Sequence, residues 1–86
     1  MPWNVTLTEA QRDALVDAMD ALITEQENGL EGIAQTRRDH TPEEWAEYIE
    51  TRARSMDRIA EIARAIGDAP ANNRATEVAS MYREEA

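Results

Sequence analysis

The sequence predicts an all-α fold: an antiparallel two-helix hairpin with a shorter third helix, forming a three-helix bundle. Apolar residues recur at alternating steps of three and four along two long segments, the spacing of a helix face packed on another helix. Each long segment also opens with a helix-start signal. The 86 residues suffice for a single domain. The expected elements are an extended arm over 1–7 and helices over about 8–36, 42–66 and 71–84.

The first helix has a clear start and an uncertain end. A capping box is available either to Thr6 with Glu9 or to Thr8 with Gln11. Gly29 could end the helix early, because glycine costs about 1 kcal/mol inside a helix. The apolar spacing continues beyond that glycine, so we expect the helix to continue to about residue 36. Its apolar seam is Val16, Met19, Ile23, Gln26, Leu30 and Ile33.

The second and third helices are bounded by local signals. Thr41, Pro42 and Glu44 supply an N-cap, a proline at the first helical position and the acid that closes a capping box. Gly67, followed by Pro70, is a stop signal. The seam of the second helix is Trp45, Ile49, Arg52, Met56, Ile59, Ala63 and Ile66. The third segment carries Ala71, Ala75, Val78 and Tyr82 at helical spacing.

Pairing the two seams antiparallel brings two polar residues to one level of the hairpin. Gln26 and Arg52 are the polar interruptions of their seams, and an unpaired guanidinium among apolar side chains is costly. We therefore expect a structural polar layer in which these residues touch, with Glu25 or another nearby acid as countercharge. In the alternative, Arg52 extends into solvent beside the seam. At the end of the hairpin, Gly29 leaves room for the indole of Trp45.

Two flanks of the hairpin need covering. Leu15, Leu22, Tyr48 and Ile62 widen the apolar stripe on one side. Ala46, Ala53, Ala60 and Gly67 follow at intervals of seven on the other, where small residues admit a close helix approach. Alanine is also the best helix former, so this row has a second explanation. If the third helix covers only one flank, the other is available for a homodimer interface.

Composition restricts the function. The chain has 18 acidic residues and 9 basic ones, all arginine, for a net charge of −9. Such a charge repels nucleic acid and anionic membranes and attracts basic surfaces. Cysteine is absent and histidine occurs once, which removes disulfides, thiolate metal sites and any two-histidine metal site within one chain. We expect a cytoplasmic protein of a bacterial or phage-infected cell, with no catalytic residue, cofactor or metal, and with no direct binding to nucleic acid or membrane.

Acidic residues gather on two faces. One side of the first helix carries Asp13, Asp17, Asp20, Glu27 and Glu31, and Glu43, Glu47 and Glu50 cluster near the start of the second helix. Both sets are candidates for binding a protein partner with a basic, nucleic-acid-binding surface. Such a partner would bind these carboxylates at the sites where it otherwise binds the phosphates of a nucleic acid. The plainer interpretation is an ordinary solvated surface.

Three functional hypotheses follow. In size, acidity and helical pattern the chain resembles the small phage-encoded inhibitors of bacterial defence, the anti-CRISPR and anti-restriction proteins, several of which mimic nucleic acid. The rival is a structural or regulatory homodimer, antitoxin-like or a scaffold, that acts through an apolar flank. The third is an enzyme, because Glu44, Glu47 and Glu50 resemble the E-x-x-E motif of helical magnesium-dependent nucleotide pyrophosphohydrolases. The second motif of those enzymes is absent, since Arg64 stands three residues after Glu61.

Overall fold

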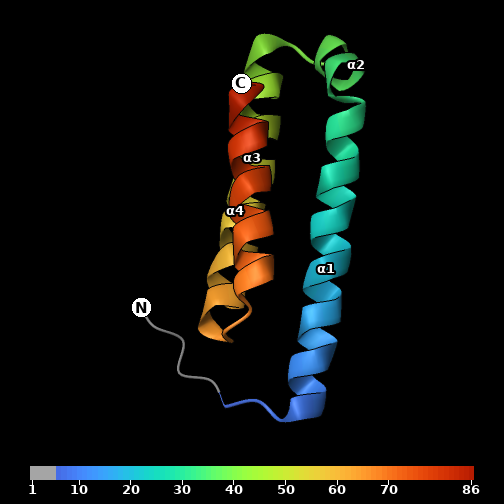
Figure 1. Cartoon of the computed structure of the whole chain (residues 1–86). Coiled ribbons are helices and arrows are strands. Elements are labelled where there is room, and N and C mark those ends of the chain that lie inside the picture. Colours follow the sequence, from blue (N-terminus) through green and yellow to red (C-terminus); the bar gives the residue numbers. More distant parts are fainter. Residues whose placement is uncertain (1–5) are drawn as a thin grey trace.

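The computed structural model describes residues 6–86, which form four helices and no strand (Figure 1). The helices are α1 (Glu9–Glu31), α2 (Ile33–Arg38), α3 (Pro42–Ala65) and α4 (Ala69–Glu84). The all-α prediction is confirmed. In Figure 1 the three long helices lie side by side, with α3 antiparallel to both α1 and α4, while the short α2 leads from α1 into the connection before α3. Residues 1–5 of the predicted arm lie outside the described residues.

The capping boxes fix where α1 and α3 begin. Of the two starts open to the first helix, the structure uses Thr8: its hydroxyl accepts from the Gln11 backbone N–H at 3.1 Å, and the Gln11 side chain accepts from the Thr8 N–H at 3.0 Å. Thr41 and Glu44 make the same pair of bonds, at 3.2 and 2.8 Å. The Thr41 backbone N–H, which donates to the Glu44 carboxylate, and next the Thr41 side chain hold the pKa of that carboxyl below its usual range.

Two predicted helix boundaries are corrected. The first helix does not continue unbroken to residue 36, because the chain leaves the helix at Gly32 and starts again at Ile33. A Cβ built at Gly32 would meet nothing within 4 Å. No packing contact therefore compensates there for the low helix propensity of glycine, and the helix breaks. The last helix begins two residues before the predicted position 71, since the Asp68 carboxylate caps it by accepting from the Ala71 N–H at 3.2 Å.

The predicted small-residue flank of α3 is where α4 packs. Ala53 and Ala60 are buried, and α4 has more extensive contacts with α3 than with α1. The helices are close enough for the Asn72 amide on α4 to donate to the backbone carbonyl of Ala60 at 2.8 Å. Ala46 and Gly67, at the ends of the row, remain exposed. Gly67 instead ends the α3 region, with a φ of 77° that favours glycine.

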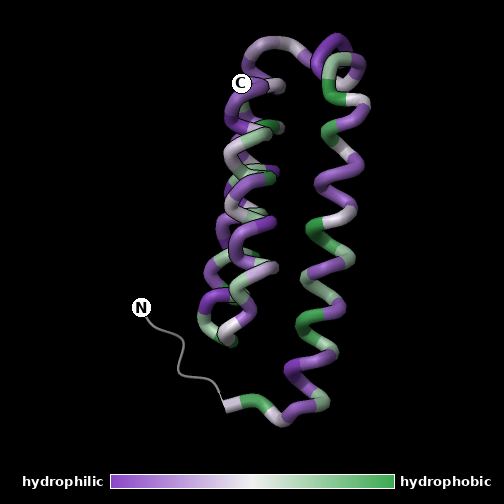
Figure 2. Tube along the Cα trace, in the orientation of Figure 1, coloured by the Kyte–Doolittle hydropathy of each residue, from purple (hydrophilic) through white to green (hydrophobic). Residues whose placement is uncertain are grey.

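The core lies between the three long helices, as the recurring hydrophobic positions in Figure 2 indicate. From α3 and α4 it takes chiefly alanine, with a few larger aliphatic side chains and the aromatic Trp45 and Tyr82. From α1 it takes only two fully buried apolar side chains, Met19 and Ile23, and the polar Gln26. α1 therefore contributes less buried apolar surface to the core than α3 and α4 do.

Tyr82 joins α4 to α1 through the core. Its side chain is fully buried, and its hydroxyl donates to the backbone carbonyl of Gln26 at 2.7 Å. The room left by Gly29 receives this hydroxyl, since a Cβ built there would lie 2.6 Å from the Tyr82 oxygen. The expectation that this space serves the Trp45 indole is therefore wrong. The indole N–H of Trp45 instead donates to the carbonyl of Glu85 at 2.8 Å.

Replacing the two glycines of the first predicted helix should affect stability differently. We expect Gly29→Ala to lower the free energy of unfolding by about 1 to 2 kcal/mol, because the new methyl group displaces the Tyr82 hydroxyl from its acceptor. Gly32→Ala, which adds a methyl group in open space, should leave stability unchanged or raise it. Urea unfolding followed by circular dichroism measures both. A Gly29→Ala protein as stable as the Gly32→Ala protein would contradict this role of Tyr82.

The buried tyrosine should also make stability depend on alkaline pH. Burial raises the pKa of the Tyr82 hydroxyl above its ordinary value of about 10. Its contribution is therefore fully present below the unfolded pKa and is lost as pH rises through the folded one. We expect the unfolding free energy to fall above pH about 10, and to fall less steeply in Tyr82→Phe. Denaturation curves at a series of pH values test this, and equal slopes for both proteins would refute it.

Candidate functional site

The acidic row of α1 is exposed, and α4 partly neutralises it. All five residues of the row are solvent-exposed: Asp13, Asp17, Asp20, Glu27 and Glu31. Arg74 of α4 pairs with two of them, through a hydrogen bond to the Asp20 carboxylate and another to Glu27 at 2.7 Å. Both bonds raise the pKa of the Arg74 guanidinium. This arginine was missed from sequence, although it lies one helical turn before the core residue Val78.

α4 adds one acidic residue next to the row, in the groove between α1 and α4 (the α1–α4 groove). Glu77 lines a hollow of about 380 Å³ between α1 and α4, together with Glu27, Glu31 and Arg74. Apart from Arg74, no basic side chain lines this hollow or pairs with a row carboxylate among residues 6–86. The α1–α4 groove therefore keeps a clear excess of negative charge.

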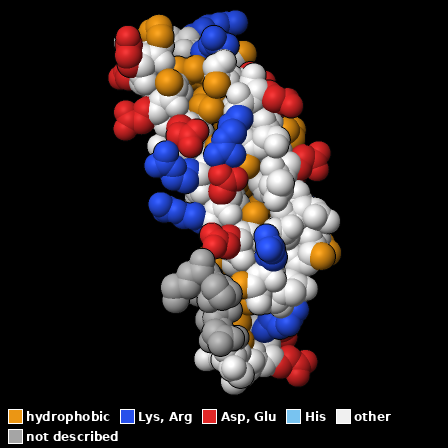
Figure 3. Space-filling model, turned by 90° about the vertical axis from the view of Figure 1, so that its left-hand side faces the viewer, with side chains coloured by type: hydrophobic (Ala, Val, Ile, Leu, Met, Phe, Trp, Pro, Cys, Tyr) orange, Lys and Arg blue, Asp and Glu red, His pale blue; other side chains and the backbone are white. Residues whose placement is uncertain are grey.

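The second predicted acidic cluster is divided. Glu43 and Glu47 are exposed and belong to none of the ion pairs formed within residues 6–86. Glu50 is instead paired with basic residues: its carboxylate lies 3.4 Å from the Arg54 guanidinium and 3.6 Å from that of Arg83. Figure 3, which shows the side formed by α3 and α4, has acidic and basic side chains interleaved. That side of the molecule is mixed in charge, unlike the α1–α4 groove.

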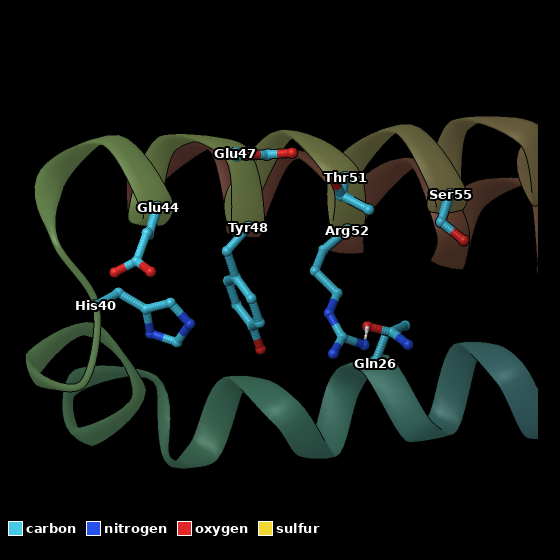
Figure 4. A pocket seen from close by; sticks show the side chains of 8 residues that line it. All are labelled: Gln26, His40, Glu44, Glu47, Tyr48, Thr51, Arg52 and Ser55. Carbon is cyan, nitrogen blue, oxygen red and sulfur yellow. Dashed lines mark hydrogen bonds between the residues drawn. The ribbon is translucent and has the colours of Figure 1, made fainter.

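The expected polar layer is present on the other side of α1. Arg52 donates from Nη1 to the side-chain oxygen of Gln26 at 3.0 Å, as the dashed line in Figure 4 marks. The predicted acidic countercharge is not found: neither Glu25 nor any other acid in residues 6–86 forms an ion pair with Arg52. The guanidinium instead lies 5.0 Å from the centre of the Tyr48 ring, in a cation–π contact.

This polar layer lines an open hollow between α1 and α3. The hollow has a volume of about 430 Å³ and is lined by Gln26, His40, Glu44, Glu47, Tyr48, Thr51, Arg52 and Ser55 (Figure 4). His40 lies at one end of the hollow and is held by a hydrogen bond of 2.6 Å between its Nδ1 and the carbonyl oxygen of Thr36. Because a carbonyl oxygen can only accept, Nδ1 carries the proton. The histidine ring lies 5.2 Å from the Tyr48 ring. Its place in the connection agrees with a structural role.

An apolar flank runs along the same side of the molecule. Leu22 is 46% exposed, and Leu15, Tyr48 and Ile62 are half-buried. The structure thus leaves open the flank that the sequence predicted to need covering by a third helix or a second subunit, since α4 packs on the opposite, alanine-rich flank of α3. Met81 on α4, 41% exposed, is the other large hydrophobic residue left exposed in residues 6–86. It lines the α1–α4 groove and not this flank.

The geometry offers two surfaces suited to binding. Within residues 6–86, no three histidine or acidic side chains gather closely enough to hold a metal ion. None of the described helices has both the length and the apolar character needed to cross a bilayer. No protein-family model, curated protein or solved structure matches this chain. The two candidate sites are therefore the acidic α1–α4 groove and the apolar α1–α3 flank.

The polar layer can be tested as a coupled pair. Gln26→Leu removes the one side-chain acceptor that Arg52 has within residues 6–86, so it should lower the unfolding free energy by about 1 to 3 kcal/mol. Adding Arg52→Met should recover most of that loss, because two apolar residues then replace both polar ones. A double-mutant cycle by chemical denaturation measures the coupling. Additive effects of the two substitutions would show that the contact does not stabilise the hairpin.

Proposed function

We propose that this is a non-enzymatic, acidic helical protein that acts by binding another protein through the α1–α4 groove. The partner presents a basic, nucleic-acid-binding surface, and the carboxylates of the groove occupy sites that phosphates otherwise fill. This mode of action suits a phage-type inhibitor of a bacterial defence complex, either anti-CRISPR or anti-restriction. Its place of action is the cytoplasm of the infected cell.

The observation that carries the proposal is the exposed carboxylate row. From Asp13 to Glu31 the row spans about 27 Å at a helical rise of about 1.5 Å per residue. Its five charges are thus about 7 Å apart along the axis on average, about twice the roughly 3.4 Å between the phosphates of one DNA strand. An exposed row of this length with a negative excess attracts a basic surface, and salt strongly weakens that attraction.

Arg74 supports this role even though it neutralises part of the row. Its two ion pairs tie Asp20 and Glu27 of α1 to α4, so those carboxylates are held in place before a partner arrives. Preorganised charges lose less side-chain entropy on binding than free ones. In this proposal the three long helices form a three-helix bundle, and Asp13, Asp17 and Glu31 remain free to meet the partner.

Charge reversal tests the proposal. Asp13→Arg, Asp17→Arg and Glu31→Arg together should abolish binding, because they replace with cations the three carboxylates of the row that form no ion pair within residues 6–86. The readouts are capture of a nucleic-acid-binding complex from bacterial lysate and phage plating on a host with an active CRISPR or restriction system. We expect the unaltered protein to retain the complex at low salt, release it at high salt and restore plating.

The matched control changes net charge equally at positions outside the row. Glu25→Arg, Glu61→Arg and Glu84→Arg lie on exposed positions of three different helices, and this variant should keep most of the activity. Circular dichroism must show the same helical content for both triple variants. Full activity of the row variant, or equal loss in both variants, would rule out recognition by this groove.

A further inference from the structure

We infer that the apolar flank between α1 and α3 pairs with the same flank of a second copy of this chain, in antiparallel orientation. The flank comprises Leu15 and Leu22 of α1 with Tyr48 and Ile62 of α3. This inference goes beyond the proposed function and does not depend on it, because the acidic row occupies the other side of α1. Both surfaces can be used by the same molecule.

The position of Leu22 follows from the contacts of its neighbours. Asp20 and Glu27 are bound by Arg74 of α4, so that edge of α1 faces α4. Gln26 is bound by Arg52, so its edge faces α3. Leu22 lies one turn before Gln26, and Leu15 lies seven residues before Leu22, which puts both on the α3 side. Leu22, which is exposed, therefore borders the partly open space between α1 and α3.

Packing explains why this flank is left open. In residues 6–86, α1 has fewer contacts with α3 than with α4, and α4 packs on the opposite, alanine-rich flank of α3. The upper part of the space between α1 and α3 is the hollow lined by Tyr48, Arg52 and Gln26. A single domain of this size buries little apolar surface, so covering the flank adds stability that the chain cannot supply alone.

The distribution of charge along α3 selects a second copy as the occupant. Glu44 and Glu47 line the hollow near the start of α3. Thr51 also lines it, and Arg58 follows Thr51 by seven residues, so Arg58 lies on the same face nearer the other end of the helix. Arg58 has no ion pair within residues 6–86. Arg52 also lines the hollow and offsets one of its two acidic charges, so the flank keeps a net negative charge at one end and has Arg58 towards the other.

A surface with opposite charges at its two ends is complementary to itself when turned through a two-fold axis. An antiparallel second copy brings the Arg58 end of each chain over the Glu44 and Glu47 end of the other, and places the two apolar flanks against each other. Such an isologous contact closes as a dimer and does not propagate. A copy in parallel orientation would instead oppose like charges, which disfavours that arrangement.

Sedimentation equilibrium and light scattering over a concentration series up to about 1 mM test the inference. We expect a dimer, and we expect Leu22→Glu to weaken it by more than about tenfold by burying a charge in the contact. Met81→Glu is the matched control, since it places the same charge on the other exposed large hydrophobic residue, away from the flank; it should leave the dimer intact. Circular dichroism checks that both variants fold.

The antiparallel arrangement has its own test. Arg58→Glu should weaken the dimer, and Glu47→Arg added to it should restore association by exchanging the two charges. A monomer throughout the concentration series, or equal effects of Leu22→Glu and Met81→Glu, would overturn the inference. A dimer that Arg58→Glu leaves unchanged, or that the double exchange does not restore, would overturn the antiparallel pairing. Reversing the acidic row should not alter the dimer, so this result is separable from the partner-binding assay.

Discussion

The close packing of α4 on the alanine face of α3 sets the position of the other tertiary contacts in the described residues. Ala53 and Ala60 on α3 leave no side-chain bulk between the helices, which brings α4 near enough for Asn72 to reach the α3 backbone. From that position Tyr82 extends across the core to α1. Larger residues in place of these alanines would move α4 outward and break both contacts.

α1 is held in a different way. Its fully buried apolar contribution is small, and polar contacts reach it from both neighbours: Tyr82 and Arg74 from α4, and Arg52 from α3. Because these contacts lie along two edges of one helical face, the rest of α1 stays exposed. One side carries carboxylates and the other carries leucines, so a single helix serves two candidate interfaces of different chemistry.

Local signals in the sequence predicted much of this fold. The all-α class, the Thr41 capping box and the seam residues follow from hydrogen bonding and helical period, which depend on nearby residues alone. The contact between Gln26 and Arg52 was also predictable, because a polar interruption in each seam falls at the same level. The break at Gly32 was not, since choosing between it and Gly29 requires knowing that Tyr82 packs beside Gly29. The candidate site was predicted less completely: the acidic row was found by its spacing, whereas its pairing with Arg74 depends on where α4 packs.

The central claim is that α3 and α4 form the stable unit to which α1 is more weakly attached. Native-state hydrogen exchange on dilute protein, resolved by residue, tests it most directly. We expect the buried amides of α3 and α4 to exchange only through global unfolding, and those of α1 to exchange through an opening of lower free energy. Amides of α1 as slow as those of α3 and α4, or faster exchange in α4 than in α1, would contradict the account.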